Sequence, residues 1–338
     1  MTRFVGSQTP DPAAASAVQI RILRAGGGLI HPRRFRSVLP LLILSLTTAT
    51  AEAQEVPVRA RHVVIISIDG LRHDVLLRAD APNVRRLIDS GSYTFWARTV
   101  PECYTLPAHV SMLTGVSPEK HGVTWNEHIE EAYPLSPTVF EVAKRGGLST
   151  ALVSGKTKFV VFDKPGTLDW RFLPRDEPVP DTFVGGVGAT IIRRHRPQLL
   201  FVHLAGVDAV GHEFGWGTPA QLAAVAEADK AVGLVLAALE ETKLRDSTLV
   251  LLTADHGGAG REHGPDDARS QYVPWVANGP GVRRNYDLTR NVELKVSVLD
   301  TFATACGALG LRPPPGVEGR FVADISAAPR ELLRDTGR

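Results

Sequence analysis

Cysteine is scarce in this sequence, which contains only Cys103 and Cys306 among its 338 residues. Small domains that depend on disulfide bonds carry many cysteines in a short chain, so that class of protein is excluded. The two cysteines lie far apart in the sequence, and sequence alone leaves their distance in the fold open. We expect both to be unpaired and to behave as small apolar residues.

A strong charge of either sign is also lacking. The chain has 38 lysine and arginine residues against 36 acidic ones, which gives a formal net charge of +2. Much of the basic excess lies within residues 1–40, where the arginines between positions 21 and 36 meet a single acid, Asp11. The rest of the chain therefore offers no basic face of the kind that binds nucleic acid.

The sequence lacks an apolar run long enough to span a membrane, for which about 20 residues are needed. The run at 38–46 is shorter, and it stands between basic residues at 33–36 and small residues at 51–53. This order is typical of an export signal. We therefore predict a cleaved leader over residues 1–53, a periplasmic or secreted protein, and no stable membrane span after processing. The alternative for this run is a membrane anchor or a buried helix.

Beyond residue 60, short β-branched runs alternate with longer amphipathic stretches, and there is no internal repeat. This pattern predicts an α/β fold with a mainly parallel sheet. We place a single catalytic domain at residues 60–326 and a solvated tail at 327–338. The predicted strands are 62–68, 149–154, 198–204, 248–253 and 272–277. The predicted helices are 83–90, 107–114, 137–145, 182–194, 219–241 and 295–309.

Three of the predicted strands run into an aspartate, namely Asp69, Asp208 and Asp255. The carboxyl ends of parallel strands lie along one edge of a sheet, where such folds bind their ligands. Three carboxylates at one edge repel each other unless a positive group lies between them. A cluster of metal ions is the simplest such partner. For any one of these aspartates alone, a helix cap or a turn is the simpler interpretation.

Histidines accompany these carboxylates at spacings typical of metal ligands. His212 follows Asp208 by four residues, so one helical turn brings both side chains to one side. His256 follows Asp255 directly, and His263 lies in the glycine-rich segment 257–264. With Asp69 these residues supply six nitrogen or oxygen ligands, enough for two divalent metal ions with open positions. Mixed carboxylate and imidazole ligands suit zinc, while manganese and iron remain open by ligand type.

The segment 104–115 contains a candidate nucleophile, Thr105. Pro107 is tolerated in the first turn of a helix, so Thr105 is expected near the helix N-terminus. The positive end of the helix dipole favours an alkoxide and a bound phosphoryl group there. Coordination to a metal dication lowers the pKa of a hydroxyl enough to make it a good nucleophile. The alternative is that Thr105 only caps the helix.

Together these segments resemble the alkaline phosphatase superfamily, nearest to its type I phosphodiesterase and nucleotide pyrophosphatase branch. The resemblance runs from about residue 62 to 325 and includes segments 69–70, 105–115, 118–122, 208–212 and 255–257. It implies a three-layer sandwich around a mainly parallel sheet, with little or no cap. It also implies two metal ions, expected to be Zn²⁺, with ligands divided between them. One ion would be held by Asp69, Thr105, Asp255 and His256, and the other by Asp208, His212 and His263.

The match to the diesterase branch is incomplete, since Ala108 stands where that branch commonly has asparagine. Asn126, Lys156 and Lys158 instead resemble the phosphate-binding set of the superfamily's arginine-and-lysine monoesterases, with Lys158 in place of arginine. Lysine supplies charge but lacks the bidentate fork of a guanidinium. The alternative is that both lysines are solvated loop residues.

Several neighbouring residues are expected to take no part in the chemistry. His109 and His121 belong to the motifs but should serve packing and turn geometry, and Arg72 should lie at the surface. We assign no special role to His203.

The predicted function is that of a metal-dependent phosphoric ester hydrolase that acts on small phosphorylated substrates. Thr105 would attack phosphorus in line, and water would then hydrolyse the phosphothreonine. The resemblance to the monoesterases favours phosphate monoesters. The alternatives are a phosphodiesterase or nucleotide pyrophosphatase of the same fold and a catalytically inactive metal-binding homologue. A sulfatase would need Cys or Ser as nucleophile, and a mutase would need a further domain; the oligomeric state stays open.

Overall fold

The computed structural model describes residues 58–327. The predicted leader at 1–53 and residues 328–338 of the predicted tail lie outside the described residues. Within residues 58–327, no helix is both long and apolar enough to cross a lipid bilayer. Cys103 and Cys306 are both buried and both free.

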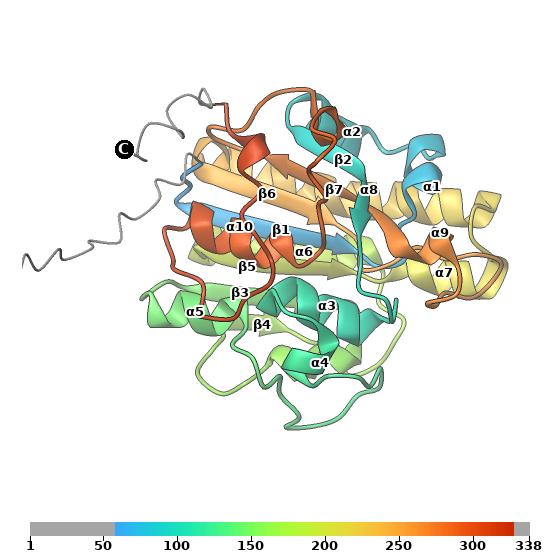
Figure 1. Ribbon diagram of the computed structural model, residues 1–338, viewed down its shortest axis with the longest axis horizontal. Helices are drawn as coiled ribbons and strands as arrows, with labels where there is room; N and C mark the ends of the chain where they lie inside the picture. The colour runs from blue at the N-terminus through green and yellow to red at the C-terminus, as the bar shows by residue number, and fades with distance from the viewer. Residues whose placement is uncertain (1–57, 328–338) are drawn as a thin grey trace, which may run out of the picture. The chain divides into compact units, whose positions relative to one another are not determined.

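An eight-stranded sheet is at the centre of this part of the chain, with the strand order β4-β3-β5-β1-β6-β7-β2-β8 (Figure 1). Only β7 runs antiparallel to its neighbours β6 and β2. The strands are β1 (His62–Ile68), β2 (Ser92–Arg98), β3 (Thr150–Ser154), β4 (Trp170–Phe172), β5 (Leu199–Leu204), β6 (Thr248–Thr253), β7 (Tyr272–Asn278) and β8 (Tyr286–Asp287).

The central strands β1, β5 and β6 are mostly apolar and almost fully buried because both faces of the sheet are covered. Strand β1 pairs in parallel with β5 on one side and β6 on the other, and Val63 lies opposite both Leu199 and Leu249. All six residues of β5 and of β6 are buried. This shared register brings the ends of the three strands to one level, and the segments that follow them start side by side.

Helices cover the sheet in two layers (Figure 1). The long helix α8 packs on α6, α7 and α2 in one layer, whereas α10 packs on α3 and α5 in the other. The α-helices are α1 (His73–Arg78), α2 (Pro82–Asp89), α3 (Thr105–Thr114), α4 (Pro118–His121), α5 (Val139–Arg145), α6 (Asp181–His195), α7 (Gly206–Phe214), α8 (Pro219–Glu241), α9 (Ala268–Gln271) and α10 (Asp300–Ala308). A six-residue 3-10 helix, η1, spans Thr157–Phe162.

These elements confirm the predicted α/β class and its mainly parallel sheet. The predicted helix 295–309 is wrong at its start, because α10 begins only at Asp300. The Asp300 carboxylate accepts a hydrogen bond from the backbone N–H of Ser297 at 2.8 Å, and the Asp300 N–H donates to the Ser297 carbonyl. This local turn ends the loop before the helix. Strands β2, β4 and β8 were not predicted.

The packing of α6 against α8 generates a test of the fold. A Cβ on Gly185 would lie 2.7 Å from the Ala231 carbonyl oxygen, whereas a Cβ on Gly186 would meet nothing within 4 Å. We expect Gly185→Ala to lower the free energy of unfolding by about 1–3 kcal/mol through overpacking, even after the gain in helix propensity. Gly186→Ala, the matched control, should raise it by up to about 1 kcal/mol.

Urea unfolding of both variants measures this difference. Equal stability of the two variants would show that α6 and α8 are not in this close contact.

Candidate metal centre

Three carboxylates lie at the carboxyl edge of the sheet, as the sequence predicts. Asp69 follows β1, Asp255 follows β6, and Asp208 is in the first turn of α7, just after β5. Gly70 permits their close approach, because a Cβ there would lie 2.9 Å from the Asp208 Cα. The Gly70 N–H also donates to Asp255 Oδ1 at 3.1 Å. All three aspartates are buried.

A buried lysine joins two of these carboxylates. Lys156 Nζ lies 2.7 Å from Asp69 Oδ2 and 2.6 Å from Asp208 Oδ2. Burial raises the pKa of both aspartates, but the ammonium group of Lys156 and neighbouring imidazoles outweigh burial, so that both pKa values lie below the ordinary range. Burial lowers the pKa of Lys156, yet the two carboxylates outweigh it and raise that pKa above its usual value.

The remaining oxygen of each carboxylate lacks a hydrogen-bond partner, although a histidine nitrogen lies 3.2–3.4 Å from it. Asp69 Oδ1, Asp208 Oδ1 and Asp255 Oδ2 are buried and accept no hydrogen bond from the part of the chain that the structure describes. The pKa of Asp255 is raised by burial and by the charges of Asp69 and Asp208. Buried carboxylate oxygens without partners are costly, so each of them is available to a cation.

Three histidines present the same ring nitrogen to these oxygens. In each of them Nδ1 lies within hydrogen-bond distance of a backbone carbonyl oxygen. The carbonyl is that of Arg261 for His212 (2.9 Å), that of Gly257 for His256 (2.9 Å) and that of Cys103 for His263 (2.7 Å). An Nδ1–H that donates to a carbonyl leaves the lone pair on Nε2 free for a metal. Burial, followed by the charge of His256, lowers the pKa of His263 to about 4, which keeps its imidazole in the neutral, metal-binding form.

The other buried histidines near the site have both ring nitrogens engaged. His109 contacts Ser67 Oγ and the Thr105 carbonyl, and His121 contacts Ser111 Oγ and the Val123 N–H. These bonds suit the packing role expected from sequence.

His203, to which the sequence gave no role, lies with Nε2 3.0 Å from Asp69 Oδ2 and Nδ1 3.2 Å from Ser154 Oγ. It therefore orients a carboxylate. Nothing in its sequence context signals this contact, because His203 is inside a strand.

The ligand atoms gather in two groups whose members all lie within 4.8 Å of one another. One group contains Asp208, His212 and His263, and the other contains Asp69, Asp208 and His256. Asp255 adjoins the second group, with Oδ2 3.2 Å from His256 Nε2. Partnerless carboxylate oxygens beside free imidazole nitrogens are a chemically suitable donor set for two zinc ions.

Thr105 is the first residue of α3 and is buried at its N-terminus. Tyr104 is the N-cap and makes no side-chain capping bond, so the alternative that Thr105 caps the helix is wrong. The Thr105 hydroxyl makes no hydrogen bond to residues 58–327. Asn126 lies beside it, because Asn126 Oδ1 accepts from the Leu106 N–H at 3.0 Å.

Lys158 completes this side of the site, with Nζ donating to Asn126 Oδ1 at 3.2 Å. Burial and the nearby charge of Lys156 lower the pKa of Lys158. The structure thus brings Asn126 and Lys158 together at the N-terminus of α3. Lys156 stands apart from this pair, since its ammonium is bound to the carboxylates.

Two further residues hold the loop that carries His263. Arg72, expected at the surface, is buried and donates from Nη1 to the Gly258 carbonyl at 2.7 Å. Trp216 holds the same loop through its backbone N–H, which donates to the Gly260 carbonyl at 2.7 Å. Its Nε1 donates to the Gly70 carbonyl at 2.8 Å, and its ring packs edge-on against His212. Sequence reasoning missed both roles, because each depends on a contact with a distant segment.

A mainly parallel sheet with this cluster at its carboxyl edge defines a member of the alkaline phosphatase superfamily. The chain belongs to the type I phosphodiesterase / nucleotide pyrophosphatase family, whose sequence profile matches residues 63–263. The family resemblance seen in the motifs is thereby confirmed.

Known relatives are similar at low identity. An uncharacterized pyrophosphatase/phosphodiesterase of Schizosaccharomyces pombe is 24% identical over 235 residues, 58% of this chain and 44% of the relative. A bis(5'-adenosyl)-triphosphatase of Xenopus laevis is 27% identical over 220 residues, 58% of this chain and 47% of the relative. The chain thus spans less than half the length of these two curated relatives.

Solved structures share the fold. Murine ectonucleotide pyrophosphatase/phosphodiesterase 5, in an inactive form in complex with AMP, superposes with a TM-score of 0.65 at 16% identity, covering 79% of this chain and 100% of the other. A phosphonate monoester hydrolase of Agrobacterium radiobacter superposes with a TM-score of 0.62 at 17% identity. The match covers 81% of this chain and 79% of the other.

The geometry predicts the effect of removing ligands. Asp208→Asn and His212→Ala should each lower the zinc content of purified protein from two ions per chain towards one, because both residues belong to the group with His263, whereas the other group keeps Asp69, His256 and the adjoining Asp255. His128→Ala, an exposed histidine paired with Glu130, is the matched control and should leave the content unchanged. Inductively coupled plasma mass spectrometry measures the number of zinc ions per protein chain. Full occupancy in both site variants would exclude Asp208 and His212 as ligands.

Proposed function

We propose that this chain is a metal-dependent hydrolase of phosphoric esters that acts through a phosphothreonine at Thr105, with phosphate monoesters as preferred substrates. The observation that carries the proposal is the orientation of the three site histidines. His212, His256 and His263 each leave Nε2 free beside partnerless carboxylate oxygens, while the other buried histidines of the site do not. The alternative is that the protein binds metal but is catalytically inactive. Measured turnover of a phosphoric ester would exclude this alternative.

Two zinc ions are the proposed cofactors. Asp69, Thr105, Asp255 and His256 would hold one, and Asp208, His212 and His263 the other. When bound, the ions supply Lewis acidity that lowers the pKa of the nucleophile and stabilises charge on the phosphoryl oxygens.

The protein residues carry the remaining chemistry. The Thr105 hydroxyl gives its proton to solvent as its oxygen bonds to phosphorus, and the bond to the leaving oxygen breaks. The leaving oxygen then takes a proton from water, so that no net proton is gained or lost. Water then attacks the phosphothreonine, releasing phosphate and restoring the Thr105 hydroxyl. The N-terminus of α3 favours the negative charge that accumulates on the phosphoryl group. Asn126 is held with Oδ1 on the Leu106 N–H and Lys158, so its amide N–H groups are free to donate to that charge.

The preference for monoesters rests on Asn126 and the two lysines. A monoester carries more non-bridging charge than a diester, so additional cations near the nucleophile favour it. Lys158 lies next to Asn126, whereas Lys156 acts through Asp69 and Asp208. We therefore assign direct recognition of the phosphoryl group to Asn126 and Lys158, and a supporting position to Lys156.

The second candidate function is that of a phosphodiesterase or nucleotide pyrophosphatase. It is favoured by the names of the relatives, which include venom phosphodiesterases, and by the murine structure in complex with AMP. The venom and ectonucleotide relatives also support the proposal that this protein is exported. We propose a small phosphorylated molecule as its partner in either case.

Thr105→Ala should lower kcat for p-nitrophenyl phosphate by at least about a thousandfold, because it removes the nucleophile. Metal content should stay near that of the wild type, since the hydroxyl is one ligand among several. Thr105→Ser, which keeps a hydroxyl, is the matched control and should retain activity. Acid quenching with ³²P-labelled substrate should trap protein-bound phosphate only where residue 105 has a hydroxyl. Label retained by Thr105→Ala would move the nucleophile elsewhere.

Lys158→Ala separates the two candidate substrate classes. It should lower kcat/KM for p-nitrophenyl phosphate by at least about tenfold, equal to about 1.4 kcal/mol, and spare bis-p-nitrophenyl phosphate. Lys164→Ala is the matched control, because Lys164 pairs with Glu141 rather than with the site. Greater wild-type activity on the diester or on a nucleoside triphosphate would contradict the monoester preference and establish the second candidate.

A further inference from the structure

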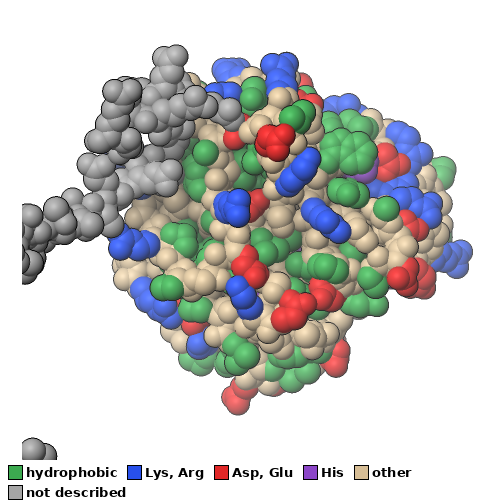
Figure 2. Space-filling view, viewed as in Figure 1, with side chains coloured by type: hydrophobic (Ala, Val, Ile, Leu, Met, Phe, Trp, Pro, Cys, Tyr) green, Lys and Arg blue, Asp and Glu red, His purple; other side chains and the backbone are tan. Residues whose placement is uncertain are grey.

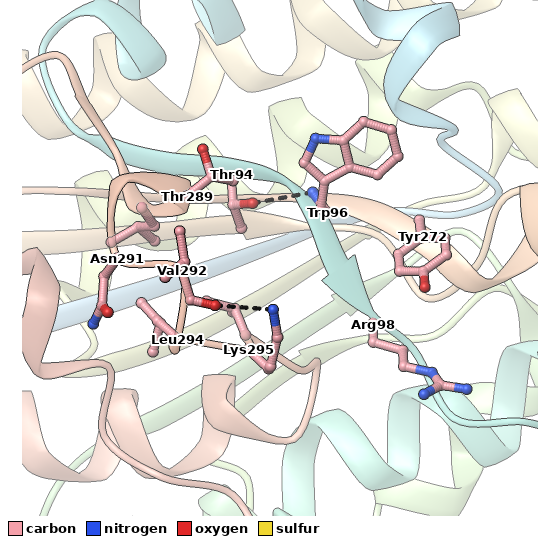
Figure 3. Close-up of a pocket in the computed structure, with 11 residues that line it drawn as sticks. Thr94, Trp96, Arg98, Tyr272, Thr289, Asn291, Val292, Leu294 and Lys295 are labelled. Atoms are coloured by element: carbon pink, nitrogen blue, oxygen red, sulfur yellow. Dashed lines mark hydrogen bonds between the residues drawn. The ribbon is translucent and has the colours of Figure 1, made fainter.

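A cavity of about 710 Å³ opens along β2, and none of its lining residues belongs to the metal centre (Figure 3). Thr94, Trp96 and Arg98 alternate along β2 and contribute side chains to it. The segment between Leu288 and Val296 forms the facing wall. The volume lies within the range of about 300–1,000 Å³ that is typical of small-molecule sites.

The cavity carries positive charge without a counterion. Arg98 and Lys295 are its charged lining residues, and no aspartate or glutamate lines it. Arg98 is exposed, and its guanidinium makes no hydrogen bond or ion pair with residues 58–327. Lys295 Nζ donates to the Val292 carbonyl at 3.0 Å and has no acidic partner in the same range. Both cations are therefore available to an anion.

The cavity also exposes apolar surface. The Trp96 side chain is 56% exposed and that of Val292 is 73% exposed. The Trp96 ring packs on His73 at a centroid distance of 4.6 Å and edge-on against Tyr272 at 5.9 Å. Figure 2 shows hydrophobic and basic side chains together on this face, over the region where Figure 1 places β2 and β7.

Backbone hydrogen bonds fix the walls of the cavity. The Arg98 N–H donates to the Val296 carbonyl at 2.9 Å, and the Val298 N–H donates to the Arg98 carbonyl at 2.9 Å. The Trp96 N–H donates to Thr94 Oγ1 at 3.1 Å, where the pairing of β2 with β7 shifts register. These bonds fix the backbone of both walls, while ring contacts position Trp96 and the Val292 carbonyl positions the Lys295 ammonium.

We propose that this cavity binds a small organic anion with an aromatic ring, such as an aryl sulfonate, carboxylate or phosphate. The anionic group would accept charge-assisted hydrogen bonds from Arg98 and Lys295. The ring would cover Trp96 and Val292 and remove their apolar surface from water. This site goes beyond the proposed hydrolysis, because its residues and those of the metal centre do not overlap.

Isothermal titration calorimetry with 1-naphthalenesulfonate tests the proposal, since a sulfonate is a weak metal ligand and carries one charge on an aromatic ring. 1-Naphthalenemethanol is the neutral probe with the same ring. The wild type should bind the sulfonate at least about tenfold more tightly than the alcohol. The double variant Arg98→Gln/Lys295→Gln should lose at least about tenfold in sulfonate affinity and keep its affinity for the alcohol. Trp96→Ala should weaken both.

The matched control is Arg194→Gln/Lys230→Gln, which removes two exposed cations on α6 and α8 and should change neither affinity. Retained binding of the alcohol by the Arg98 and Lys295 double variant shows that the cavity remains folded. The proposal is overturned if the wild type binds no sulfonate. It is also overturned if the sulfonate affinity survives in that double variant or in Trp96→Ala.

Discussion

The crowding of three buried carboxylates at one edge of the sheet is the constraint on which the rest of the site depends. Two unit charges of like sign about 4 Å apart repel by about 4 kcal/mol even at an effective dielectric constant of about 20. Asp69, Asp208 and Asp255 are brought together by the shared register of β1, β5 and β6 and by the absence of a side chain at Gly70. Lys156 neutralises part of this charge through one oxygen each of Asp69 and Asp208. The oxygens that lack a hydrogen bond are the positions at which the proposed cations would bind.

The surrounding segments orient three histidines towards these carboxylate oxygens. Each site histidine is fixed by a backbone carbonyl from its own or another segment, so Nε2 points to the carboxylates. His263 is tied to the Cys103 carbonyl, and Cys103 lies two residues before Thr105. One hydrogen bond therefore links the loop that carries His263, a proposed metal ligand, to the segment that carries Thr105, the proposed nucleophile. The position of Thr105 and the geometry of the metal centre depend on each other through this link.

Much of this arrangement is readable from sequence because it follows from local pattern. The buried strands that precede the three aspartates are mainly apolar runs, and a spacing of four residues places Asp208 and His212 on one side of a helix. Strand β2 was missed because its aromatic and polar residues show no clean alternation, and its pairing with β7 is set by tertiary contacts. The contacts of Lys156 and His203 span 52 and 134 positions in sequence, so no local signal reveals them.

The central claim is that these carboxylates and imidazoles form a two-metal centre. Anomalous diffraction at the zinc edge, from crystals of protein purified in the presence of zinc, tests it most directly. Two peaks are predicted, one among Asp208, His212 and His263 and the other beside Asp69, Asp255 and His256. The absence of both peaks, or zinc bound only elsewhere on the chain, would contradict the claim.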